Sequence, residues 1–260
     1  MALRNMHRIR RVLCALICGA WTFTGPIGDA NAFEPGLPGS LTPDFIQFFD
    51  TLALTADYGP FNNRPPWVRK WSGPVRIVLD PSAEVLRGEI ETLSARLSGW
   101  AGIPFTVAPP DTATAADTWN VITVQLLRRR VFQRLYNSRD VVCQTETHGV
   151  GGALQVGYMV LSEGYTDCLK HEFMHALGFD SHWNPAASSD IRSVLAYRES
   201  AARSEDFTRW DIMAIRVLYD GRIRAGMTRQ KSLRIAYEMI GGRPQEAALP
   251  ADVAGQADYR

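Results

Sequence analysis

The sequence predicts an α+β fold. Short segments with the apolar patterns typical of strands fall in the first part of the chain, at residues 75–79, 103–107, 121–127 and 153–161. Segments with helical apolar spacing lie between them, and only helical segments follow residue 165. The 260-residue chain has no internal repeat and no linker long enough to divide it, so we expect one domain with two lobes.

Each predicted helix is indicated by its apolar spacing or by a start signal. The segment 42–56 begins with a threonine before a proline and spaces its apolar residues on one face. An Asp-Pro pair at residues 80–81 opens a helix that runs to about residue 97. Residues 128–136 predict a short basic helix, whose consecutive arginines form either a solvated face or a charged patch. Three more helices are expected, at residues 166–177, 208–219 and 228–240.

The first 32 residues have the layout of a secretory signal peptide. Four arginines precede a short apolar run at residues 12–20, and Ala30-Asn31-Ala32 supplies a cleavage site. The run is shorter than the roughly 20 residues of a membrane span. We therefore expect a secreted or periplasmic protein that is cut near Ala32 and has no membrane span in its mature part. Residues 242–260 are expected to be a flexible tail.

Charge and cysteine content narrow the functional classes. The formal net charge is +1, and loss of the signal segment, with four basic residues and one acidic residue, leaves about −2. This balance excludes a polybasic nucleic-acid-binding protein. Two cysteines remain after cleavage, Cys143 and Cys168. In an exported protein they predict one disulfide, and the alternative is two separate buried thiols.

A metal-binding pattern begins at His171. His171 and His175 are four residues apart, so on a helix both imidazoles lie on one face and can reach a single ion. Zinc suits this pair, because it accepts imidazole nitrogen in a tetrahedral site with one open position. Glu172 lies next to the ion without being its ligand, where it can take a proton from water. His182 follows Gly178, a residue suited to end the helix.

This stretch resembles the metzincin zinc peptidases, whose motif is His-Glu-x-x-His-x-x-Gly-x-x-His. The match consists of two histidines, a glutamate and a glycine: His171, Glu172, His175 and Gly178. The third histidine comes one residue late, at His182, and the family's position holds Ser181. The resemblance implies one catalytic Zn²⁺ with His182 as third ligand, and His148 or a water as the alternatives.

The resemblance also implies a fold. A metzincin-like domain has a mixed twisted sheet, an active-site helix and a mainly helical C-terminal lobe. Here the domain would span residues 33–241, with an upper lobe of about residues 33–178 and a lower lobe of about 179–241. The strand at 153–161 resembles the family's edge strand, which pairs with extended substrate, and the alternative is an ordinary core strand.

Further similarities lie downstream. Ser193-Val-Leu-Ala-Tyr197 is similar to the family's Met-turn beneath the metal, with Leu195 in place of methionine. Tyr197 matches the tyrosine that steadies the reacting oxyanion in the astacin and serralysin branches, and the alternative is a packed tyrosine. Residues 207–220 are similar to the closing helix of matrixin-like domains. The same half of the chain also resembles a family of exported bacterial proteins of unknown function.

The function implied by the resemblance is that of an exported zinc endopeptidase. Glu172 would be the general base, and Tyr197 would assist at the oxyanion. The expected partner is a peptide or protein substrate, and we expect a monomer that binds no nucleic acid. Two alternatives stay open. One is a non-catalytic metzincin-like module of the cell envelope that binds metal or a partner, and the other is zinc-dependent hydrolysis of a non-peptide bond.

Overall fold

The computed structural model describes residues 42–55, 67–109, 119–138, 141–185 and 189–241. Within these ranges the chain is α+β, with six α-helices and a mostly parallel six-stranded sheet. The expected signal peptide, at residues 1–32, and the expected tail, at residues 242–260, lie outside the described residues. No helix in the described part is long and apolar enough to cross a membrane.

The sheet has the strand order β1-β6-β4-β2-β3, and β5 pairs with β6. The pairs along this path are parallel, and the β5–β6 pair is antiparallel. The strands are β1 Lys70–Trp71, β2 Val75–Leu79, β3 Phe105–Val107, β4 Val121–Leu127, β5 Cys143–Val150 and β6 Ala153–Ser162. All four predicted strands are confirmed, and β1 and β5 were not predicted.

The exposed edge beside the predicted site is β5, not β6. β6 pairs with β4 along one side and with β5 along the other, so it is an interior strand. The expectation of a substrate-pairing edge strand at residues 153–161 is therefore wrong. β5 has the largely polar sequence CQTETHGV, which lacks the apolar alternation of a typical strand. It becomes a strand because β6 supplies its hydrogen-bonding partner.

The six helices correspond to the six predicted ones. They are α1 Thr42–Leu54, α2 Arg87–Ala101, α3 Arg129–Tyr136, α4 Leu169–Ala176, α5 Arg209–Tyr219 and α6 Arg229–Met239. Two of the predicted helices begin with a short 3₁₀ turn, Pro81–Leu86 before α2 and Thr166–Cys168 before α4. Asp80 caps the first of these turns, since its side chain accepts a hydrogen bond from the Ser82 amide.

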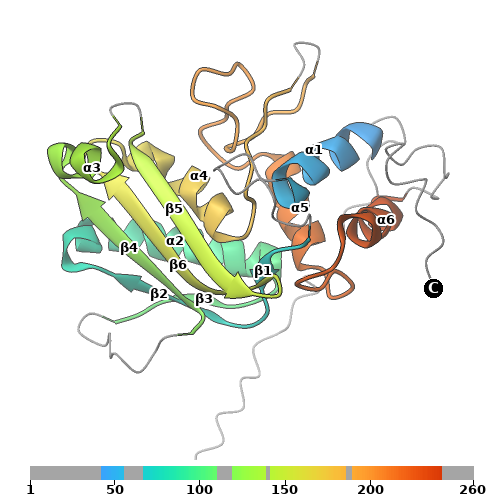
Figure 1. Cartoon of the computed structure of the whole chain (residues 1–260), viewed down its shortest axis with the longest axis horizontal. Coiled ribbons are helices and arrows are strands. Elements are labelled where there is room, and N and C mark those ends of the chain that lie inside the picture. Colours follow the sequence, from blue (N-terminus) through green and yellow to red (C-terminus); the bar gives the residue numbers. More distant parts are fainter. Residues whose placement is uncertain (1–41, 56–66, 110–118, 139–140, 186–188, 242–260) are drawn as a thin grey trace, which may run out of the picture.

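Five of the six described helices lie in two groups. Figure 1 shows α2 and α4 behind the sheet, and α1, α5 and α6 grouped together beside β1. α1 contacts both α5 and α6, and α2 contacts α5. In its described residues, the long segment between α4 and α5 contains little regular structure apart from isolated bridges such as Trp183–Ala196 and Ser193–Arg203.

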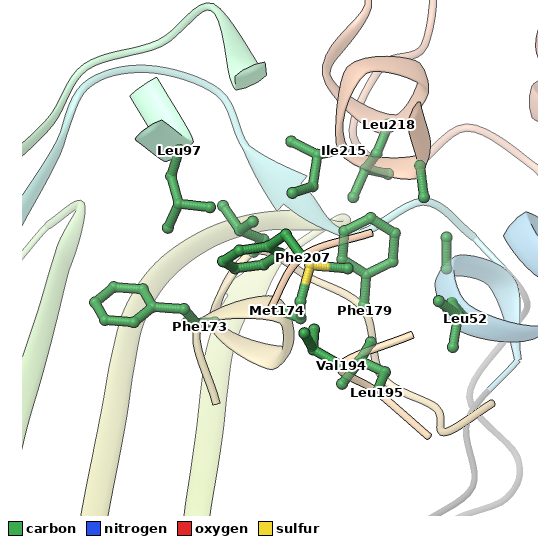
Figure 2. Packing of buried hydrophobic residues seen from close by; sticks show 14 of the residues in the cluster. Leu52, Leu97, Phe173, Met174, Phe179, Val194, Leu195, Phe207, Ile215 and Leu218 are labelled. Atoms are coloured by element: carbon green, nitrogen blue, oxygen red, sulfur yellow. The ribbon is translucent and has the colours of Figure 1, made fainter. Parts of the chain in front are cut away.

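One apolar core joins these parts. Figure 2 shows Phe173 and Met174 of α4 beside side chains from the segment that follows it and from α5, among them Phe179, Leu195 and Ile215. All five are fully buried. Burial of apolar surface stabilises a fold by roughly 25 cal/mol per Å², so this contact is a main determinant of how α4 is oriented.

A buried lysine links the sheet to the end of α5. Lys70 of β1 is only 7% exposed, and its Nζ donates to the carbonyl oxygens of Leu218 and Ile223 at 2.8 and 2.9 Å. Carbonyl groups in the last turn of a helix lack an intrahelical partner, and the ammonium group supplies one. Burial lowers the pKa of Lys70 to about 8, against the opposing effect of Asp220.

Candidate metal centre

Three imidazole nitrogens converge in the structure. His171 and His175 project from the same face of α4, and their Nε2 atoms are 3.1 Å apart. Nε2 of His182 is also 3.1 Å from Nε2 of His171. Two nitrogen ligands of a tetrahedral zinc ion lie about 3.3 Å apart, given Zn–N distances of about 2.0–2.1 Å. The three histidines therefore have the spacing of a group that could hold one metal ion.

The tautomers of the two helical histidines also suit a metal. Nδ1 of His171 is 2.8 Å from the carbonyl oxygen of Val194, and Nδ1 of His175 is 2.6 Å from that of Phe179. A carbonyl oxygen only accepts, so each Nδ1 carries the proton and each Nε2 presents a lone pair. Two lone pairs that face each other across 3.1 Å repel, and a cation between them removes that repulsion. The ring orientations are fixed by the same carbonyl contacts.

The surroundings favour the neutral form of His171 and His182. Burial lowers the pKa of His171 well below its usual range, with further lowering from His175 and His182. Burial likewise lowers the pKa of His182 to about 3, with a smaller contribution from His175. Neutral imidazole is the form that binds a metal ion, and three such ligands with an open fourth position suit zinc and other borderline transition metals.

The chain between α4 and His182 turns sharply at Gly178. This residue has φ +106°, and a Cβ there would lie 2.2 Å from the carbonyl oxygen of Arg69, so only glycine fits. Ser181, at the position where the metzincin motif has its third histidine, is buried and donates to the carbonyl oxygen of Thr55 at 2.7 Å. The following residue, His182, faces the two helical histidines instead.

His148 does not belong to this group. It lies on β5 with its side chain 60% exposed, and its Nε2 is 3.8 Å from a carboxylate oxygen of Glu146. The structure thus brings His182, and not His148, to the two helical histidines.

Glu172 is buried beside the histidines. It is 4% exposed, and its Oε2 has no hydrogen-bond partner among the described residues. Thr145 of β5 contacts it, donating to the Glu172 carbonyl oxygen at 3.3 Å. Burial raises the pKa of the Glu172 carboxyl group, while the nearby His175 and Thr145 act in the opposite direction. A buried carboxylate with a free acceptor oxygen is suited to receive a proton.

Tyr197 covers His182. The two rings are stacked, with centroids 4.7 Å apart and an angle of 10°, and the tyrosine is 36% exposed. Below it, Leu195 is fully buried, as expected for the floor of the site. The Leu195 carbonyl oxygen accepts a hydrogen bond of 2.9 Å from the amide of Trp183, next to His182.

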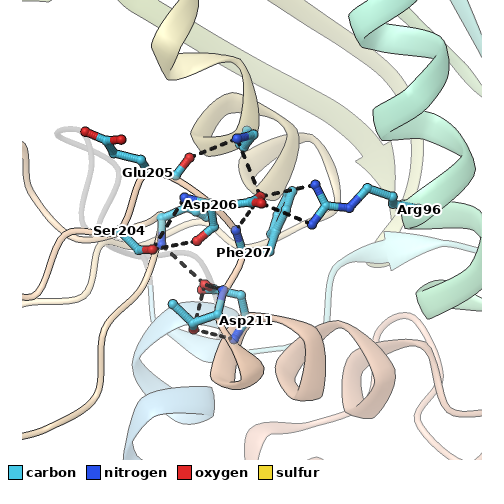
Figure 3. A network of polar contacts seen from close by, with 9 residues as sticks. Arg96, Ser204, Glu205, Asp206, Phe207 and Asp211 are labelled. Carbon is cyan, nitrogen blue, oxygen red and sulfur yellow. Dashed lines mark hydrogen bonds and ion pairs between the residues drawn. The ribbon is translucent and has the colours of Figure 1, made fainter.

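The turn at residues 193–197 is held by a buried aspartate. Asp211 lies in the first turn of α5, and its carboxylate accepts from Ser193 Oγ at 2.5 Å and from the amides of Val194 and Thr208 at 3.3 and 2.9 Å. Burial raises the pKa of Asp211, against these hydrogen bonds. Figure 3 shows that Asp211 and the nearby Asp206 have different partners, because Asp206 pairs with Arg96.

Two cavities meet at the histidines. The first, of about 320 Å³, runs along β5 and ends at Arg69 and Asp180. The second, of about 150 Å³, lies between the disulfide and Tyr197. Glu172, His171 and His182 line both. The Cys143–Cys168 disulfide, as predicted, joins β5 to the 3₁₀ turn before α4 and so forms part of both walls.

No protein-family model, curated protein or solved structure matches this chain.

Sequence reasoning missed one charged cluster at this site. Arg69 donates to both carboxylate oxygens of Asp180, and its Nη2 donates to the carbonyl oxygen and Oγ1 of Thr147 at 2.7 and 2.8 Å. The guanidinium group thereby ties β5 to the loop that carries His182. Its partners are 78 and 111 residues away in sequence, so no local pattern could have indicated the contact.

Proposed function

We propose that this protein is an exported zinc endopeptidase. The observation that carries the proposal is the convergence of three Nε2 atoms beside a buried glutamate whose Oε2 has no partner among the described residues. Imidazole and carboxylate groups in this arrangement match the needs of metal-assisted hydrolysis. The resemblance to the metzincin motif supports the same reaction class.

The roles follow from the surroundings of each side chain. His171, His175 and His182 would hold the ion, which when bound supplies a Lewis acid and lowers the pKa of water. Glu172 would accept the proton of the attacking water and later deliver it to the leaving amine, because its Oε2 has no competing donor among the described residues. Tyr197, which is partly exposed beside His182, would donate a hydrogen bond from its hydroxyl to the developing oxyanion.

The edge strand β5 supports a peptide substrate. β5 pairs with β6 alone among the described strands, and its residues line the larger cavity up to the histidines. An extended peptide can add to such an edge by main-chain hydrogen bonds, which give affinity without demanding a particular sequence. We propose that this strand takes the substrate-pairing role that the sequence had suggested for residues 153–161.

A comparison of the wild-type protein with Glu172→Gln tests the proposal. The matched control is Glu163→Gln, at an exposed glutamate in the turn after β6. We expect one zinc per chain in all three proteins, and cleavage of a mixed fluorogenic peptide library that falls by about 10³-fold in Glu172→Gln alone. Mass spectrometry of the products would identify the bonds that are cut.

Other results would point elsewhere. Zinc binding without cleavage of any peptide by the wild-type protein would favour the non-catalytic module. Glu172-dependent hydrolysis of esters or other bonds, with peptides left intact, would favour the non-peptide reaction. A protein that stays metal-free in excess Zn²⁺ would contradict the zinc peptidase and both of its zinc-dependent alternatives.

A further inference from the structure

The two cavities beside the histidines differ in how their arginines are paired. In the larger cavity the guanidinium of Arg69 is bound to the carboxylate of Asp180. In the smaller cavity, next to Tyr197, two arginines line the wall, Arg198 and Arg203. Neither makes an ion pair with a carboxylate in the described part of the chain. The smaller cavity thus presents guanidinium groups whose charge is not neutralised by a partner.

Arg203 is held by its backbone and Arg198 by its side chain, and these contacts leave the hydrogen-bond donors of both guanidinium groups available. The backbone of Arg203 is anchored twice, because its amide donates to Ser200 and its carbonyl oxygen accepts from Arg192 at 2.7 Å. The guanidinium of Arg198 lies over the ring of Tyr165, with its centre 5.3 Å from the ring centroid. Cation–π contact holds a guanidinium without consuming its hydrogen-bond donors. The two groups are therefore prepared to bind an anion.

The acidic groups of this cavity do not cancel that charge. Glu172 is buried and belongs to the reaction site, and Asp167 is exposed. Neither forms an ion pair with the two arginines in the described part of the chain. Arginine binds carboxylates through two parallel hydrogen bonds, which are among the strongest in water-accessible sites.

We propose that the cavity between Tyr197 and the Cys143–Cys168 disulfide is a carboxylate-binding subsite, in which Arg203, with Arg198, binds a substrate carboxylate next to the bond that is cut. This inference rests on the proposed function and narrows its substrate class. The carboxylate comes from one of two sources: a Glu or Asp side chain within the peptide, or the free carboxyl group of its C-terminal residue. The second source would make the protein release short C-terminal fragments.

A set of peptides built on one that the wild-type protein cleaves tests this subsite. In one series the residue on either side of the cut bond is Glu or Gln, and in the other the C-terminus is a free acid or an amide. Values of kcat/KM are measured for the wild type, Arg203→Gln, Arg198→Gln and the control Arg224→Gln. Arg224 is exposed and removed from both cavities, and its replacement changes the net charge equally.

The expected result is a preference for the carboxylate of about 10- to 100-fold in the wild type and the control. It should fall to within about threefold in Arg203→Gln and partly in Arg198→Gln, because glutamine leaves the substrate carboxylate without its charged partner, whereas Arg224→Gln should keep the wild-type preference, cleavage rate and zinc content. If the carboxylate is a side chain, only the Glu/Gln peptides should show the preference. If it is the C-terminal carboxyl group, only the acid/amide peptides should show it. Equal rates for both members of each pair, or a preference that survives in Arg203→Gln, would overturn the subsite.

A binding measurement separates this proposal from the proposed function. Acetyl-glutamyl hydroxamate and acetyl-glutaminyl hydroxamate differ only in the carboxylate, and their affinity for the zinc-loaded protein is measured by calorimetry. Tighter binding of the glutamyl compound that is lost in Arg203→Gln supports the subsite even where no peptide is cleaved. Equal binding, or no binding of either compound, counts against the subsite whatever the cleavage assays show.

Discussion

The two parts of the candidate metal centre are built in different ways. His171 and His175 are one turn apart on α4, so their spacing is set by backbone hydrogen bonds within eight consecutive residues. His182 lies in an irregular segment, and its position depends on hydrogen bonds that the residues before and after it make to distant parts of the chain. Ser181 bonds to Thr55, and Trp183 bonds to Leu195. A single centre thus combines a local element with a set of long-range contacts.

This difference shows where the centre is most easily disturbed. On α4 a change in one neighbouring side chain leaves the helical spacing intact. In the segment after α4, the fold depends on a few buried polar groups that each hydrogen-bond to several parts of the chain. Asp211 is one of these, because its carboxylate accepts from Ser193, Val194 and Thr208. We therefore expect the largest effects from changes that act on this irregular part.

Replacement of Asp211 should break the irregular part most severely. Asp211→Ala leaves the donors of Ser193, Val194 and Thr208 without their acceptor, and each donor that is buried costs about 1–3 kcal/mol. We expect the free energy of unfolding to fall by about 4 kcal/mol in denaturant titrations. Asp206→Ala is the control, because this 56%-exposed aspartate pairs with Arg96 on the surface and should cost less than about 1 kcal/mol. Equal losses of stability in the two variants would contradict the role of Asp211 in holding the turn at residues 193–197.

Removal of the disulfide tests the helical part. Cys143 and Cys168 close a loop with a sequence separation of 25, and this cross-link should contribute about 3 kcal/mol through the entropy of the unfolded chain. The double variant Cys143→Ser/Cys168→Ser should lose that amount in thermal or denaturant unfolding, and reduction of the wild type should match it. Zinc affinity should be retained, because the spacing of the α4 histidines does not depend on the bridge. Unchanged stability on reduction would refute a formed disulfide.

Single histidine replacements test whether the helical and irregular parts contribute equally to zinc affinity. His175→Ala and His182→Ala should each weaken zinc binding by at least about 100-fold, or about 2.8 kcal/mol, measured by competition with a chelator. His148→Ala is the control and should bind as the wild type does, because His148 is exposed and outside the group. An affinity that is undiminished in His182→Ala would remove the irregular part from the centre and leave water as the third ligand.

The most gradual effect expected is a pH dependence of stability from Lys70, which joins the sheet to α5. Its pKa is lowered to about 8 in the folded protein, from 10.5, so between these values the unfolded chain binds more protons. Stability should therefore rise with pH from about 8 to 10.5, by up to about 1.4 kcal/mol per pH unit. Unfolding titrations of the wild type and Lys70→Met should differ in this slope. Identical slopes would mean that burial does not lower the pKa of Lys70 in the folded protein.

The same division explains what the sequence could predict. The helical histidine pair, the approximate positions of the helices and the cysteine pair follow from spacing and composition, which act within short stretches. The strand β5 could not be predicted, because its polar sequence becomes a strand only against β6. The orientation of His182 was also beyond local reasoning, since it depends on Ser181 turning toward Thr55 in a segment 126 residues away. The Arg69–Asp180 pair was missed for the same reason.

Lys70 also limits how far the sheet and the C-terminal helices can move apart. To separate α5 from β1, the protein would have to pull a charged ammonium group away from the carbonyl oxygens of Leu218, Asp220 and Ile223. Such a step is costly, because the charge would lose its partners before it reached water. The buried ammonium group therefore acts as a rigid link between the end of α5 and the sheet.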